Sequence, residues 1–233
     1  MDLQFHVKFI QGSLFFPNFP YGAKLNLVNA LNKSTPILLE KDPTFLPIPD
    51  DAPPEIPRII LSNKTGEFQC NISPNRIDFF YHERKEPKLF DEIFQKVYPL
   101  YRDLFFAIKS DFNPSINRIS LVTKLMSALS ESSINLIMKL FLKERMFGNP
   151  YNLDLIILYK EMLDTFKINR LTKIRSLRKK DNLEDDTRLE LDIEINTLSE
   201  ILGNYSVEAI DKFYQLIKNN FNQYVAQFFE QVH

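Results

Sequence analysis

The residues of this chain that could carry chemistry are few and scattered. Cys70 is the single cysteine, and the three histidines lie far apart. A lone cysteine forms no intramolecular disulfide and makes no zinc site by itself. Cys70 shares a predicted strand face with Phe68 and Ile72, which indicates a small buried hydrophobe, because a nucleophilic thiolate would need electropositive surroundings.

His82 and three carboxylates are the other candidates for acid–base or metal chemistry. His82 closes a predicted strand, so it is either a solvated strand end, which we favour, or a general base or nucleic-acid contact. Glu190, Asp192 and Glu194 alternate along one strand, where they could bind a divalent cation. Charge pairing with nearby cations is the better interpretation. We predict no metal, no cofactor and no catalytic residue.

Those cations form a short basic segment just before the acidic strand. They are Arg170, Lys173, Arg175, Arg178, Lys179 and Lys180. If the two segments form a hairpin, opposite charges face each other, and each pair adds roughly 0.2–1 kcal/mol. Taken alone, the cations could instead contact phosphates, which makes nucleic-acid binding the alternative function. The segment lacks the interleaved aromatic residues on which bases stack.

Two predicted helices, residues 134–147 and 206–232, are more apolar than burial on one side requires. For the first helix we favour burial inside its own domain, with packing against a second subunit or partner as the alternative. We predict a surface for a protein partner or a second copy of the chain. Its residues are Leu136, Leu140, Phe141, Met146, Phe147, Phe228 and Phe229.

The composition is that of a soluble globular protein, with 44% hydrophobic and 25% charged residues. The net charge of -1 excludes the broad basic footprint of a general nucleic-acid binder. No segment approaches the ~18 apolar residues of a membrane span. The first residues do not resemble a secretory signal, so we expect a cytoplasmic protein without membrane contact.

The order of predicted elements repeats in two halves, residues 1–112 and 113–233, which we expect to form one continuous domain. Residues 43–57 hold six prolines and should form an extended surface connection. In the first half we predict strands at 3–9, 36–40, 56–62, 67–72 and 76–82, and helices at 21–31 and 88–109, the second kinked or split at Pro99. In the second half we predict strands at 116–125, 152–160, 162–179 and 188–195, besides the two apolar helices; residues 171–177 also fit a helix.

Each half therefore runs strand, helix, three or four strands and long helix. We predict an α+β fold made of a duplicated unit, with a mostly antiparallel sheet and the long helices on one face. This order is similar to that of the TATA-binding-protein-like fold. A shared element order does not by itself confer nucleic-acid binding.

Three segments resemble a sporadically distributed, uncharacterised family of bacterial proteins of about this length. The first runs from Pro57-Arg58 through the Gly66 turn to Arg76-Ile77, and the second is the strand at 116–121. The third is the strand at 189–196, ahead of the aromatic C-terminal helix. The chain departs from the family pattern at Lys64-Thr65, at Ser120, and after Arg76, where no Trp follows. The resemblance supports the architecture and implies no activity.

We therefore expect a non-catalytic interaction or regulatory protein that binds a partner through its apolar helices. The five glycines form no phosphate-cradling cluster, so an enzyme is the less favoured reading. If the sporadic distribution of the resembling family reflects gene transfer, a role in a bacterial defence or toxin-neutralising locus follows by analogy.

Overall fold

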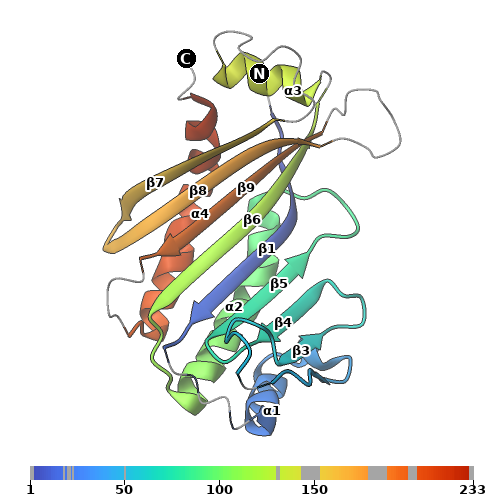
Figure 1. Cartoon of the computed structure of the whole chain (residues 1–233), viewed down its shortest axis with the longest axis vertical. Coiled ribbons are helices and arrows are strands. Elements are labelled where there is room, and N and C mark those ends of the chain that lie inside the picture. The colour runs from blue at the N-terminus through green and yellow to red at the C-terminus, as the bar shows by residue number, and fades with distance from the viewer. Residues whose placement is uncertain are drawn as a thin grey trace.

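A computed structural model describes most of the chain. The described residues are 3–17, 19, 22, 24–49, 51–129, 132–142, 153–177, 188–198 and 204–230. They form an α+β protein with one large antiparallel sheet of nine strands and with four α-helices (Figure 1).

The sheet has the order β2-β3-β4-β5-β1-β6-β9-β8-β7, and all neighbouring strands are antiparallel. The strands of the first half are β1 (His6–Phe15), β2 (Thr44–Phe45), β3 (Ile59–Ser62), β4 (Phe68–Ile72) and β5 (Arg76–His82). Those of the second half are β6 (Arg118–Ala128), β7 (Asp154–Leu163), β8 (Phe166–Leu177) and β9 (Arg188–Thr197). The first strands of the two halves, β1 and β6, pair at the centre.

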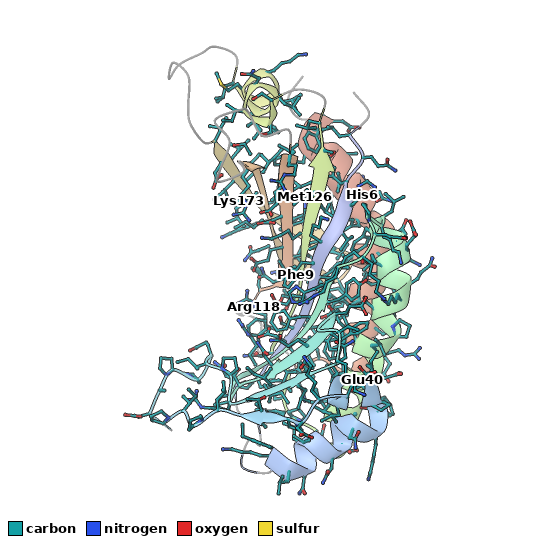
Figure 2. All side chains as sticks on the ribbon, turned by 90° about the vertical axis from the view of Figure 1, so that its right-hand side faces the viewer. His6, Phe9, Glu40, Arg118, Met126 and Lys173 are labelled. Atoms are coloured by element: carbon teal, nitrogen blue, oxygen red, sulfur yellow. The ribbon has the colours of Figure 1, made fainter. Side chains whose placement is uncertain are left out.

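Two long helices, α2 (Phe90–Phe112) and α4 (Val207–Glu230), cover one face of the sheet (Figure 1). The shorter α1 (Lys24–Ser34) and α3 (Ser133–Phe141) lie at opposite ends of the molecule. The opposite face of the sheet carries no described helix (Figure 2). The predicted gathering of the long helices on one face is thus confirmed.

The core lies between the sheet and the two long helices. Tyr101 of α2 and Tyr214 of α4 are buried, and their ring centroids are 6.1 Å apart. The Tyr101 hydroxyl donates to the carbonyl of Phe79 (3.0 Å), and the Tyr214 hydroxyl donates to the carbonyl of Ser120 (3.0 Å). Each hydroxyl is therefore satisfied by the sheet backbone, which is what burial of a tyrosine requires.

Several local features have clear physical reasons. Gly66 has φ +70°, the positive value that the turn between β3 and β4 requires. The Ser132 side chain accepts a hydrogen bond from the backbone of Asn135 and caps α3. Residues 166–177 form a strand, so the helical alternative for 171–177 is wrong.

Other local predictions are wrong. Residues 36–39 form a 3₁₀ helix instead of a strand. The helix α2 runs through Pro99, so the predicted split at this residue is wrong, whereas a kink there stays a prediction. The first strand, predicted at 3–9, runs from His6 to Phe15 and has a register shift between Val7 and Phe9. After the shift Ile10 is buried, and Phe9 lies with its partner His82 on the face that carries no described helix, which we call the helix-free face.

Candidate functional site

A cavity of about 420 Å³ opens where α2 begins, beside the C-terminal half of α4. This volume is in the range of small-molecule and side-chain binding pockets. Seven of its lining residues are apolar and three are polar. They are Leu3, Phe5, Leu89, Phe90, Leu125, Phe221 and Val225, with Gln4, Asp91 and Asn222. We call this the tip cavity.

The walls of the tip cavity come from four parts of the chain. The segment ahead of β1 contributes residues 3–5, β6 contributes Leu125, and the two long helices supply the rest together with Leu89, the residue that precedes α2. The rings of Phe90 and Phe221 stack with centroids 3.5 Å apart and join the helices. The amide of Asn222 donates to the carboxylate of Asp91 (3.4 Å) across the same gap. Leu89 is 41% exposed, so its side chain is accessible to a ligand.

Beside the cavity lie most of the residues predicted to bind a partner. Phe228 and Phe229 of α4 contact Phe141 of α3, with ring centroids 5.1 and 6.3 Å apart, and Phe229 stacks on the cavity residue Phe5 (5.7 Å). Phe228 and Leu136 are buried inside the protein.

The other predicted partner residues are less enclosed or are not described. Phe141, Phe229 and Leu140 are only half-buried. Met146 and Phe147 lie outside the described residues. The structure therefore brings five of the seven predicted residues to the same end of the molecule, where internal packing occupies two of them.

The basic segment pairs with the acidic strand in the way that its charges predicted. Arg175 lies opposite Glu190, and Lys173 opposite Asp192, in the β8–β9 register. Arg175 forms ion pairs with both Glu190 and Asp192. Lys173 binds Asp154 on its other side (2.7 Å). Burial raises the pKa of Asp192, against the opposing effect of the Lys124 charge.

The Arg170 side chain takes no part in these pairs and lies on the other face of the sheet, against α4. Its side chain is 2% exposed, and its Nε is 2.8 Å from a carboxylate oxygen of Glu161. Its guanidinium carbon lies 4.0 Å from the ring centre of Tyr159 and 4.6 Å from that of Tyr224. Arg178, Lys179 and Lys180 lie outside the described residues. Nucleic-acid binding by this segment stays a prediction.

The helix-free face carries aromatic and arginine side chains that the sequence analysis missed. The guanidinium carbons of Arg118 and Arg76 lie 4.6 and 5.5 Å from the ring centre of Phe15. Arg76 also binds Asp78 (2.7 Å), which accepts from Ser13 as well. The sequence indicated that each arginine begins a strand. That Phe15 lies between the two arginines follows only from the register of the sheet.

The remaining candidates for chemistry sit in structural surroundings. Cys70 is buried, as predicted, and this burial raises the pKa of its thiol far above the ordinary range. His82 lies beside Phe9, with ring centroids 5.1 Å apart. Burial and the charge of Arg84 lower the pKa of His82. Within the described ranges, no group of three His, Cys, Asp or Glu side chains could hold a metal ion.

Of the helices in the described part of the chain, none combines the length and the apolar character that crossing a bilayer requires.

Comparisons with known proteins name no family. No family model matches the chain, and no curated protein matches it. Among solved structures, the substrate-free duplicated taurocyamine kinase from Schistosoma mansoni aligns with 92% of this chain at 12% identity and a TM-score of 0.34. The chain spans 32% of the length of that kinase. A likeness of this size carries no argument about fold or function.

Proposed function

We propose that this protein is a non-catalytic binding protein that holds an apolar segment of a protein partner in the tip cavity. The observation that carries the proposal is the cavity of about 420 Å³, whose lining combines seven apolar side chains with the polar side chains of Gln4, Asp91 and Asn222. A pocket of this size can accept an apolar side chain of a partner. Asp91 adds a negative charge to the lining, so a partner segment with a basic residue beside its apolar anchor fits best.

The neighbouring aromatic residues extend this surface. Phe229 is half-buried and stacks on Phe5, which lines the cavity, and Phe141 lies beside Phe229. Clustered aromatic side chains around a pocket are typical of binding hot spots. A helix or extended segment that inserts a side chain into the cavity would cover these rings.

The test is affinity capture of the tagged full-length chain from its native host, with and without nuclease, followed by identification of protein and nucleic acid. We compare the wild type with Leu89→Arg, which places a bulky charge at an accessible lining position. Leu25→Arg is the matched control, because Leu25 is 70% exposed on α1 and does not line the cavity. A photo-crosslinking residue at position 89, and at position 25 as control, then locates the contact.

We expect a stoichiometric protein that resists nuclease, is lost from Leu89→Arg, is retained by Leu25→Arg, and crosslinks at position 89 only. Capture that Leu89→Arg leaves unchanged would remove the tip cavity from the proposal. Recovery dominated by nucleic acid and lost with nuclease would replace it by the nucleic-acid alternative. Products of genes that flank this one are the first candidates, in line with the analogy to defence and toxin-neutralising loci.

We also propose that the two halves are copies of one duplicated unit with the TATA-binding-protein-like order. The support is topological. From β1 outward, the first half continues with β5, β4 and β3, and from β6 outward, the second half continues with β9, β8 and β7. Each half ends in a long helix on the same face.

A further inference from the structure

The outermost strand of the second half is β7. It is ten residues long and, among the described residues, pairs only with β8 (Figure 1). The amide of Ser176 donates to the carbonyl of Leu153 (3.4 Å), so odd-numbered residues of this strand direct their backbone groups toward β8. The N–H and C=O groups of the even-numbered residues 154–162 therefore point outward.

The side chains of these even-numbered residues are unusually apolar for an exposed edge. Ile156, Leu158 and Met162 are 55%, 56% and 59% exposed. Proteins normally protect a long edge strand by charge, proline, a bulge or a covering element, because unpaired backbone groups beside apolar side chains recruit another strand. The opposite edge of the sheet is β2, which has only two residues.

The sequence of β7 is complementary to itself in one antiparallel register. If a two-fold axis passes through Ile157, Asp154 of one copy lies opposite Lys160 of the other, and Ile156 lies opposite Leu158. Both pairs occur twice. Only even-numbered residues then exchange hydrogen bonds across the axis, which matches the direction of the free backbone groups. In the part of the chain that the structure describes, Lys160 has no carboxylate partner, so this register would supply one.

The neighbouring register, centred on Leu158, uses the same backbone groups but matches the side chains poorly. It places Asp154 opposite Met162 and Ile156 opposite Lys160. Opposite charges directly across two strands stabilise the pairing, whereas a charge facing an apolar side chain gains nothing. The register centred on Ile157 is therefore favoured.

We propose that β7 pairs with β7 of a second copy of this chain, antiparallel and centred on Ile157, so that the two sheets become continuous. This inference is independent of the proposed function, because the tip cavity lies between α2 and α4, away from the β7 edge. On the helix face, Leu155 would lie opposite Tyr159, and Ile157 opposite its own copy, so these half-buried side chains would also lose exposed area.

The first measurement is the mass of the purified wild-type chain in solution, by light scattering after size exclusion, from micromolar to hundreds of micromolar concentrations. We expect twice the monomer mass of 27.5 kDa. Leu158→Pro removes an outward N–H without removing a bond to β8, and Leu158→Lys brings two like charges close to the axis. Both should shift the protein to the monomer, while Leu25→Lys should leave the dimer intact.

The second measurement fixes the register. Cys70 is buried, so one introduced cysteine is the only accessible thiol among the described residues. Residues directly opposite in a non-hydrogen-bonded pair have Cα atoms about 4.5 Å apart, within the range that a disulfide needs. Ile157→Cys should therefore crosslink to a dimer under mild oxidation, and Leu158→Cys should not.

The outcomes decide the proposal. A wild-type chain that is monomeric at all concentrations overturns it. A dimer that persists in both Leu158 variants, or that crosslinks through Leu158→Cys and not through Ile157→Cys, overturns the stated interface. A monomeric Leu158→Pro whose circular dichroism spectrum is native, together with crosslinking at position 157, supports the proposal even if Leu158→Lys fails to fold.

Discussion

Gly12 allows the helix layer to approach the centre of the sheet. A Cβ atom at this position would lie 2.5 Å from Cε2 of Tyr101. The Tyr101 ring is buried, and its hydroxyl donates to the carbonyls of Phe79 and Ile10, so a shift of the ring would disturb these hydrogen bonds. A single residue without a side chain thus sets the position of α2 against β1.

We predict that Gly12→Ala lowers the free energy of unfolding by about 1–3 kcal/mol, because the added methyl group overpacks a filled core. Urea denaturation followed by circular dichroism measures the change. Gly22→Ala is the control, because nothing lies within 4 Å of a Cβ built there. Equal stability of the two variants would show that Tyr101 can be displaced.

Arg170 and Glu161 form a pair in which only one member is deeply buried. Arg170 is 2% exposed and Glu161 is 30% exposed. We predict that Glu161→Ala destabilises the protein by roughly 2 kcal/mol, because it leaves the buried guanidinium without a counter-charge. Arg170→Met should cost less, since the remaining carboxylate can be hydrated.

The order of the two effects is the informative result. Urea denaturation at one protein concentration gives both values, with the exposed Lys167→Ala as a neutral reference. A larger loss for Arg170→Met than for Glu161→Ala would mean that packing of Arg170 between Tyr159 and Tyr224, and not its charge, dominates its contribution.

At the scale of elements, α2 contains a proline, Pro99, which disfavours the helix around it. Pro99 is exposed in the helix interior, where it removes a backbone donor and disfavours the helical conformation of the residue before it. The helix continues nonetheless, because buried side chains on both sides of Pro99 pack against the core, among them Val97, Tyr98 and Tyr101. Tertiary packing outweighs the local preference that would split the helix at Pro99.

Pro99→Ala should therefore stabilise the protein, by about 1–3 kcal/mol, because it restores a helical hydrogen bond and adds a better helix former. The loss of proline rigidity in the unfolded chain offsets a part of this gain. Thermal unfolding measures the shift, and the nearby exposed Gln95→Ala should leave the midpoint almost unchanged. A lower midpoint for Pro99→Ala would refute the argument.

At the scale of the whole molecule, the two halves are joined in the sheet and in the helix layer. β1 and β6 pair from His6 to Phe15. Across the helix layer, the Tyr98 hydroxyl donates to the carboxylate of Asp211, and Phe90 stacks on Phe221. Separating the halves would expose an apolar face and an open sheet edge at once.

We accordingly predict that residues 1–112 and 113–233 unfold together as one domain. Far-ultraviolet circular dichroism and tyrosine fluorescence should give superimposable urea transitions. Gly12→Ala, although it alters only the first half, should move both signals by the same amount. Two separate transitions, or a shift in one signal alone, would show that the halves are independent.

Alternation and periodicity were sufficient to predict most strands, the two long helices and the antiparallel class, because these patterns follow from the geometry of each element. The charge pairs of β8 and β9 were predictable for the same reason, since Arg175 and Glu190 lie on facing positions of adjacent strands. The local predictions failed where contacts with another segment determine the local structure, as at the bulge before Phe9 and at Pro99.

The candidate surfaces needed the tertiary structure. The tip cavity combines residues 3–5 with Leu89, Leu125 and Val225, which are far apart in the sequence and meet only when both helices lie on the sheet. The edge position of β7 is likewise a property of strand order, which no single strand encodes. Patterns within a segment report which face is buried, whereas the fold decides which segments meet and which edge remains free.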